Sequence, residues 1–194
     1  MDPIERLKAN IHASIEAKRL LIANGEVLSL FAKTVTVVVE RYKRGGRIYI
    51  AGNGGSAADA QHLAAEFVSK LARDRAPLPA EALTVDSSIL TAIGNDYGFE
   101  QVFSRQLAGK LTGNDVFLGI TTSGNSPNIL RALEQCRTVG VPSIVFCGGD
   151  GGAAKALADY CIVAPGTATS TIQEVHIVLA HTLCECVESA MFAA

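Results

Sequence analysis

The feature that most constrains the fold is an alternation of short apolar runs with helical patterns, which begins at residue 47. The apolar runs cover residues 47–51, 82–85, 115–121, 142–147 and 160–163. The helical patterns between and after them cover residues 57–71, 87–94 with 99–110, 127–139, 152–158 and 169–192. Strands that alternate with helices form a parallel sheet covered on both faces. The sequence therefore predicts an α/β three-layer sandwich around a five-stranded parallel sheet.

Two amphipathic helices are predicted ahead of this alternation, over residues 3–23 and 25–43. Apolar residues recur in both at helical spacing, as at Ile4, Leu7 and Ile11 in the first. Gly25 lies near the break between the helices, and two glycines end the second. We expect these helices to be added to the N-terminal side of the sheet.

Composition excludes several classes of protein. The chain has 194 residues, of which 48% are hydrophobic and 19% charged, which is typical of one globular domain. A net charge of −2 lacks the basic excess that binds polyanions, so nucleic acid is not expected as a partner. The N-terminus lacks the apolar core of a signal peptide, and no apolar run approaches the roughly 20 residues of a membrane span. We therefore expect no membrane association.

The cysteines indicate a reducing compartment. They lie at positions 136, 147, 161, 184 and 186, mostly inside apolar runs, and none forms a C-x-x-C pair. An odd number of such residues is typical of reduced thiols in the core of a cytoplasmic protein.

A glycine-rich turn follows the first predicted strand and reads Gly52-Asn53-Gly54-Gly55-Ser56. In parallel sheets, ligands bind beyond the carboxyl ends of the strands. Glycines let backbone N–H groups approach an anion, and the N-terminus of the following helix favours negative charge. Ser56 is the expected N-cap of that helix, which is predicted to begin near residue 57. The alternative is a tight turn that binds no ligand.

The same turn also fits the G-x-G-x-x-[GA] pattern of dinucleotide sites. That function requires an acidic residue about 20 positions further on, at the end of the second strand. Asp74 has this spacing but lies in residues 73–79, a segment with two prolines that is the best candidate for a flexible piece. Asp86 lies too far along. We therefore expect no nucleotide cofactor.

A second polar loop follows the third predicted strand and reads Thr121-Thr122-Ser123-Gly124-Asn125-Ser126-Pro127. A helix capped by Ser126 and started by Pro127 accounts for those two residues but not for the other three hydroxyls. Neutral hydroxyl donors beside a helix N-terminus can bind a phosphate monoester. Two anion-binding turns at one sheet edge predict a small phosphorylated ligand.

His62 and Glu66 lie four positions apart, on one face of the helix after the glycine turn. The closing helix carries Gln173 and His181, eight residues and about 80° apart, whereas His176 is about 140° from His181. Taken singly, each is more often a hydrogen-bonded or solvated helix residue than a ligand. If the four meet, their nitrogen and oxygen atoms suit Zn²⁺, although their spacing alone does not establish that they do.

Four stretches resemble the phosphoheptose isomerases, which act on sedoheptulose 7-phosphate and belong to the sugar-isomerase (SIS) family. They read AGNGGSAADAQHLAAEF, LTAIGNDYGFEQVFSRQL, GITTSGNSPNIL and TIQEVHIVLAH. The resemblance runs from the N-terminal helices to the C-terminus. It implies a homotetramer with active sites at subunit interfaces. Residues 1–45 would be a helical extension that packs in the oligomer, and residues 46–194 the SIS domain that binds a sugar phosphate.

The resemblance also implies roles for particular residues. The substrate would be contacted by Asn53, Gly54, Gly55, Ser56, Glu66, Asn95, Asp96 and Gln173, with its phosphate on Thr121, Thr122, Ser123 and Ser126. One zinc ion per subunit would be held by His62, Glu66, Gln173 and His181. The family's loop commonly has Ser where Thr121 stands, which keeps the hydroxyl. No role is carried over to Lys70, Arg73 or Arg75.

The implied reaction interconverts D-sedoheptulose 7-phosphate and D-glycero-D-manno-heptose 7-phosphate through an enediol. The product would serve nucleotide-activated heptose and cell-envelope glycans such as lipopolysaccharide. We hypothesise that Glu66 removes the proton from carbon and that His181 serves the oxygen or returns a proton. Because a carboxylate bound to zinc is a poorer base, either the metal polarises the carbonyl or Glu66 exchanges between metal and substrate.

Two alternatives use the same turns. Some SIS relatives are non-enzymatic tetramers that bind a replication-initiator protein. Others are isomerases or sensing domains for a different sugar phosphate. The presence of Glu66 together with His181 favours catalysis here.

Overall fold

A five-stranded parallel sheet forms the centre of the protein in the computed structural model, which describes residues 2–192. The strands are β1 (Ile48–Gly52), β2 (Ala80–Ala82), β3 (Val116–Thr121), β4 (Ser143–Cys147) and β5 (Tyr160–Val163). Their order across the sheet is β2-β1-β3-β4-β5. The predicted parallel sheet is confirmed. Because the chain leaves β1 for one edge and returns to β3 on the other side, the carboxyl ends of β1 and β3 flank the switch point where ligands bind.

The second strand differs from its prediction over residues 82–85, because β2 begins and ends earlier. It is an edge strand that pairs with β1 at only three positions, the last being Ala82 opposite Ile50. The predicted apolar run continues to residue 85, although the pairing of β2 with β1 ends at Ala82. Leu83 is buried in the core, whereas Val85 is 62% exposed. An apolar run therefore marked the burial of Leu83 rather than the extent of the strand.

Eight α-helices and one 3-10 helix connect or flank the strands of the described chain. They are α1 (Pro3–Ala23), α2 (Gly25–Lys43), α3 (Gly55–Val68), α4 (Ser87–Tyr97), η1 (Phe99–Gln101), α5 (Ser104–Lys110), α6 (Pro127–Val139), α7 (Ala154–Leu157) and α8 (Thr169–Met191). The two predicted N-terminal helices are confirmed. The side chain of Asp2 caps α1, and that of Asn24 caps α2.

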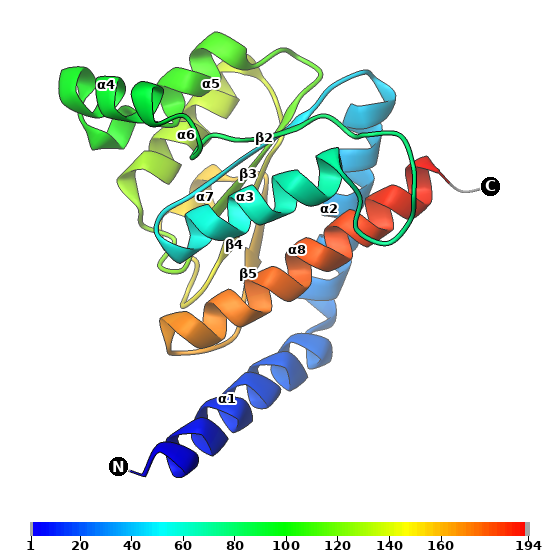
Figure 1. The fold of residues 1–194 in the computed structure, drawn as a ribbon, viewed down its shortest axis with the longest axis vertical. Helices are drawn as coiled ribbons and strands as arrows, with labels where there is room; N and C mark the ends of the chain where they lie inside the picture. Colours follow the sequence, from blue (N-terminus) through cyan, green and yellow to red (C-terminus); the bar gives the residue numbers. More distant parts are fainter. Residues whose placement is uncertain (1, 193–194) are drawn as a thin grey trace.

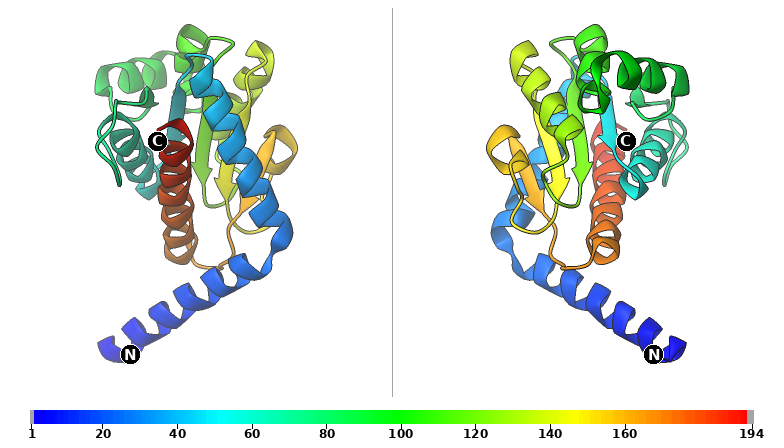
Figure 2. Two further views of the ribbon diagram at one scale, coloured as in Figure 1. Left: turned by 90° about the vertical axis from the view of Figure 1, so that its right-hand side faces the viewer. Right: turned by 90° about the vertical axis from the view of Figure 1, so that its left-hand side faces the viewer.

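Helices cover both faces of the sheet (Figures 1 and 2). On one face α2, α3 and α8 pack through buried residues such as Val38, Phe67 and Leu179. On the other face α4, α5 and α6 pack through residues such as Leu107 and Leu133. The sheet is therefore buried on both sides, as its continuous apolar strands require.

The helices α3 and α8 lie side by side and run in the same direction (Figure 1). At their amino ends, a Cβ added to Gly55 would lie 2.6 Å from Nε2 of Gln173. In the middle, Nε2 of His62 lies 3.2 Å from Nε2 of His181. Beyond the end of α3, Nε of Arg75 donates to Glu188 of α8 at 3.0 Å. These contacts define an α3–α8 pair that carries most of the candidate site.

Helix α1 extends away from the body of the protein (Figures 1 and 2). Its exposed apolar side chains include Ile4, Leu7, Ile11 and Ile15, at 62%, 60%, 49% and 59%, and Ile22 near its end is 72% exposed. Its buried residues are Ser14, Ala17 and Leu21. Within residues 2–192 no single helix has the length and apolarity to cross a membrane, although α1 and α2 pass that test as a pair bent by 80°. Packing of residues 1–45 in an oligomer stays a prediction.

Candidate functional site

The glycine turn and the hydroxyl loop meet at one pocket of about 310 Å³. Its lining residues are Asn53, Gly54, Gly55, Ser56, Ile120, Thr121, Thr122, Ser126, Thr169 and Gln173. The two segments meet because β1 and β3 are neighbours, with Gly52 opposite Ile120 at their carboxyl ends. The amino ends of α3 and α6 also lie here, and both carry partial positive charge. The pocket thus combines hydroxyls with two helix N-termini.

Close packing explains the glycines of the turn. A Cβ at Gly52 would collide with the carbonyl group of Ser56, and Gly54 has a φ of +56°. Helix α3 begins at Gly55 with Gly54 as its N-cap, and no side chain caps it. The prediction that Ser56 caps a helix from residue 57 is therefore wrong. The glycines allow a tighter turn than expected, so Ser56 lies in the first helical turn and is 3% exposed.

A pair of amides, which sequence reasoning missed, joins the two halves of the pocket. Asn53 donates from Nδ2 to Oδ1 of Asn128 at 2.9 Å, and Asn128 donates in return at 2.8 Å. Asn128 is only 2% exposed. Because the side-chain oxygen of Asn53 and one of its N–H groups are used in this pair, the amide fixes the turn against α6. The position of Asn128 in the first turn of α6 gave no sign of a partner so far away in the chain.

The hydroxyls of the loop are partly bonded to one another. Oγ1 of Thr121 and Oγ of Ser126 lie 3.0 Å apart, and Oγ of Ser123 accepts from the N–H of Asn125 at 3.1 Å. Ser126 occupies the N-cap position of α6 and Pro127 begins the helix, as predicted. The Ser126 side chain, however, makes no capping hydrogen bond. Its hydroxyl is turned toward Thr121 and the pocket instead.

Three side chains of the α3–α8 pair form a group that could hold a metal ion. Nε2 of His62 lies 2.8 Å from Oε1 of Glu66, and Nε2 of His181 lies 3.4 Å from the same oxygen. One ligand atom from each of the three lies within 4.8 Å of the others. The other carboxylate oxygen, Oε2 of Glu66, is buried without a hydrogen-bond partner. A buried polar atom needs a partner, so this donor set fits a divalent cation that accepts nitrogen and oxygen ligands.

A further carboxylate lies one helical turn before His62. Oδ2 of Asp59 is buried without a hydrogen-bond partner. Burial raises the pKa of Asp59, while His62 and His181 act in the opposite direction. Sequence reasoning missed this residue, although its spacing from His62 of three positions places both on one side of α3. The imidazoles therefore face two carboxylates rather than one.

The remaining residues implied by resemblance lie at different distances from this group. Gln173 lines the pocket with its amide against Gly55, and its role as a metal ligand stays a prediction. Asn95 and Asp96 are exposed at the end of α4, where Nδ2 of Asn95 donates to Asp96 at 2.8 Å. Neither lines the pocket, and α4 covers the opposite face of the sheet from α8. One chain alone does not bring these two residues to the turns.

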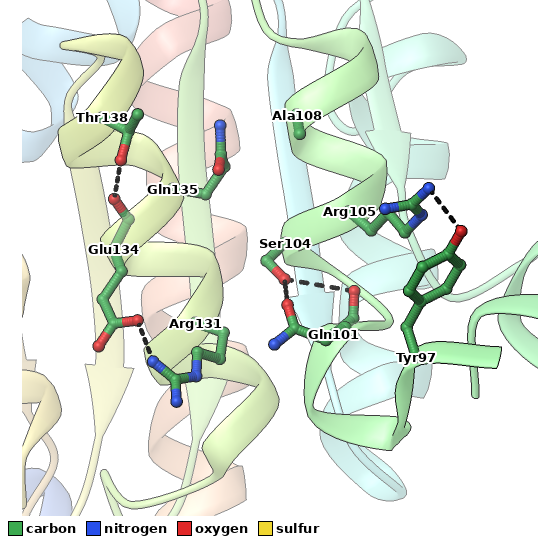
Figure 3. Close-up of a pocket in the computed structure, with 9 residues that line it drawn as sticks. All are labelled: Tyr97, Gln101, Ser104, Arg105, Ala108, Arg131, Glu134, Gln135 and Thr138. Carbon is green, nitrogen blue, oxygen red and sulfur yellow. Dashed lines mark hydrogen bonds and ion pairs between the residues drawn. The ribbon is translucent and has the colours of Figure 1, made fainter. Parts of the chain in front are cut away.

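A larger hollow, of about 580 Å³, lies between α5 and α6 (Figure 3). Its arginines already have partners: Arg105 donates to the hydroxyl of Tyr97 at 2.9 Å, and Arg131 pairs with Glu134 at 2.8 Å. It shares no residue with the two turns or with the possible metal group. The volume of a pocket alone therefore does not identify the candidate functional site in this protein.

Comparison with known proteins gives matches over nearly the whole chain. The family model for the SIS domain matches residues 26–148. Phosphoheptose isomerase of Aneurinibacillus thermoaerophilus is 50% identical over 186 residues, covering 96% of this chain and 94% of that protein. Phosphoheptose isomerase 2 of Campylobacter jejuni is 47% identical, covering 96% and 92%. The solved structure of the Neisseria gonorrhoeae phosphoheptose isomerase matches with a TM-score of 0.91 at 39% identity, covering 97% and 100%.

Proposed function

Because the chain belongs to the phosphoheptose isomerases of the SIS domain family, we propose that it interconverts D-sedoheptulose 7-phosphate and D-glycero-D-manno-heptose 7-phosphate. The protein is then an aldose–ketose isomerase of heptose synthesis. The observation that carries this proposal is the placement of Glu66 and His181 on the α3–α8 pair, whose amino ends line the pocket that the hydroxyl loop completes.

The hydroxyl loop would hold the phosphate. Thr121, Thr122 and Ser126 line the pocket, with Ser123 beside them in the loop. No lysine or arginine lines it, so the helix N-termini and neutral donors would supply the attraction. Binding the phosphate in this loop would fix the distance from the loop to the carbons that react. Binding energy far from the reacting carbons would thus position them.

Glu66 is the proposed base. Its Oε1 lies against both imidazoles, and its Oε2 makes no hydrogen bond within the described residues. The carboxylate would take the proton from the carbon beside the carbonyl, giving the enediol, and would return it to the neighbouring carbon. His181 would donate a proton to the carbonyl oxygen and later recover one from the other hydroxyl. No redox cofactor is needed for this exchange.

We also propose Zn²⁺ as the cofactor, held by His62, Glu66, His181 and Gln173. The arrangement of the first three supports this choice. Zinc, when bound, supplies Lewis-acid polarisation of an oxygen ligand. The two oxygens of Glu66 differ in their surroundings, so one can serve the metal while the other serves the substrate.

The proposed assembly is a homotetramer in the cytoplasm, with sites completed by neighbouring subunits. Two observations support it. The exposed apolar side chains of α1 need a partner surface, and Asn95 and Asp96 lie outside their own chain's pocket. A second copy could supply both. Nucleic acid and membranes are not proposed as partners.

The decisive experiment uses Glu66→Gln and follows aldose formation from sedoheptulose 7-phosphate. Loss of the base should lower kcat by about 10²- to 10⁴-fold without changing the fold or assembly. The matched control is Glu185→Gln, which changes an exposed carboxylate on α8 and should be neutral. A panel of other ketose phosphates, each with and without chelator, tests substrate and metal dependence. A folded Glu66→Gln protein with the wild-type rate would sink the assignment of the base.

A further inference from the structure

The segment that follows α3, residues 69–79, is fastened by one buried arginine. Arg75 donates from Nη2 to the carbonyl of Glu66 at 2.9 Å and from Nη1 to the carbonyl of Phe67 at 2.7 Å. Nη1 also lies 3.2 Å from the carbonyl of Ser69. The last carbonyls of a helix lack partners within it, so this guanidinium caps the carboxyl end of α3. Residues 73–79, whose prolines and charges predicted a flexible piece, are thus tied back onto the helix that carries Glu66.

The same guanidinium is tied to α8. Nε of Arg75 donates to Oε2 of Glu188 at 3.0 Å, and the backbone N–H of Arg73 donates to Oε1 at 2.7 Å. Both side chains of the ion pair are only 2% exposed. The ring of Phe192 lies 5.7 Å from the guanidinium carbon of Arg75. The carboxyl ends of α3 and α8 are therefore joined by a pair that water does not screen.

Geometry connects this ion pair to the possible metal group. Glu66 accepts the Arg75 hydrogen bond with its backbone carbonyl, while its side chain contacts His62 and His181. Glu188 lies seven residues after His181, about two turns further along α8. Any change in the spacing of the helix ends thus alters the distance between Glu66 and His181. Catalytic groups displaced by about 1 Å can lose roughly 10²-fold in rate.

We propose that Arg75 and Glu188 are positioning residues, which clamp α3 to α8 and thereby set the distance from His62 and Glu66 to His181. Their role in the reaction rests on the proposed isomerase function, but the clamp itself does not. A buried ion pair is poor evidence for stability, because an apolar pair of the same volume often serves as well. Its directional hydrogen bonds, in contrast, fix geometry.

The test compares Glu188→Gln and Arg75→Lys with Val187→Ala. Glutamine keeps the shape of Glu188 but not its charge, and lysine keeps the charge of Arg75 but not its fork. Val187 is fully buried beside Glu188, so its truncation loosens α8 without touching the ion pair. Four quantities are measured in each protein: kcat, KM, the affinity for Co²⁺ from its visible spectrum, and the His62–His181 Nε2 distance in a crystal structure.

We expect both clamp variants to lower Co²⁺ affinity and kcat by about 10- to 100-fold. KM should stay within about twofold, because the hydroxyl loop is untouched. The His62–His181 distance should exceed the 3.2 Å seen here. Val187→Ala should lower the thermal midpoint while leaving kcat and Co²⁺ affinity near the wild-type values.

Two results would overturn the clamp. One is an unchanged His62–His181 distance with unchanged Co²⁺ affinity in Glu188→Gln. The other is an equal loss of kcat and Co²⁺ affinity in Val187→Ala, which would make the effect one of general stability. A wild-type protein without isomerase activity would refute the proposed function alone, because the metal affinity and the distance are measured without substrate.

Discussion

The two ends of the α3–α8 pair are built in opposite ways. At the amino end, Gly55 and Gln173 meet beside an open pocket lined by hydroxyls. At the carboxyl end, Arg75 and Glu188 are buried and bonded at nearly every polar atom. Binding requires donors that are free for a ligand, whereas positioning requires donors that are already satisfied. One helix pair thus leaves donors free at one end and is held at the other, with His62, Glu66 and His181 between.

Among the changes at the open end, the largest effect is expected from Asn128→Ala, which removes the only side-chain link described between the two turns there. The amide of Asn53 would lose both of its hydrogen bonds to residue 128, and the two turns would lose their relative alignment. We expect kcat/KM to fall by about 10²-fold, measured with sedoheptulose 7-phosphate. The control Asn114→Ala removes an exposed amide and should change little. Equal activity of the two variants would show that the open end needs no internal link.

A smaller effect is expected from Gly55→Ala, which probes the contact between the amino ends of the helices. The new Cβ would lie 2.6 Å from Nε2 of Gln173, so the amide must move. Loss of one contact from Gln173, either a hydrogen bond to the substrate or coordination of the metal, should raise KM or lower kcat by about tenfold. Gly109→Ala in α5 is the matched control, because its Cβ meets nothing within 4 Å. If both variants behave like wild type, Gln173 has no role at the site.

Ser126→Ala tests the hydroxyls of the open end and should act more weakly. The substitution removes one donor from the hydroxyl loop. It also removes the 3.0 Å contact between the Ser126 hydroxyl and Oγ1 of Thr121, which leaves that oxygen free for a ligand. KM should rise by about 3- to 10-fold with little change in kcat. Inorganic phosphate should bind more weakly by a similar factor in calorimetry. The control is Thr138→Ala, which removes a hydroxyl at the far end of α6. If the Thr138→Ala and Ser126→Ala proteins bind phosphate equally well, the hydroxyl loop is not the phosphate site.

At the closed end the remaining prediction concerns the loss of stability in acid. Burial alone would raise the pKa of Glu188, but the Arg73 N–H and the Arg75 guanidinium outweigh it and hold that pKa below its usual value. The carboxylate therefore contributes stability above the unfolded-state pKa of about 4.3, and this contribution is lost as pH falls through the lower folded-state value.

The measurement is the thermal midpoint between about pH 6 and pH 3. Wild type should lose stability below about pH 4, and Glu188→Gln should show a shallower dependence because it has no proton to gain. Glu185→Gln on the exposed side of α8 should follow wild type. Parallel curves for wild type and Glu188→Gln would mean that the closed end is not held by this charge.

Two contacts that sequence reasoning missed join residues that are distant in the chain. Asn128 bonds to Asn53 across 75 positions, and Glu188 bonds to Arg75 across 113. Nothing within either local segment marks the other member. The errors at β2 and Ser56 have a related cause: the end of an edge ladder and the tightness of a turn depend on what packs against them.

The sequence by itself determined the features that depend on neighbours along the chain. It determined the bounds of α1 and α2, the parallel sheet, the places of the glycine turn and the hydroxyl loop, and the shared face of His62 and Glu66, because periodicity and turn chemistry are local. Only the tertiary structure decided that His181 reaches Glu66 and that Arg75 and Glu188 close the far end of the same helix pair. Those contacts arise from packing two helices on one face of a sheet, and no local pattern encodes the distance between them.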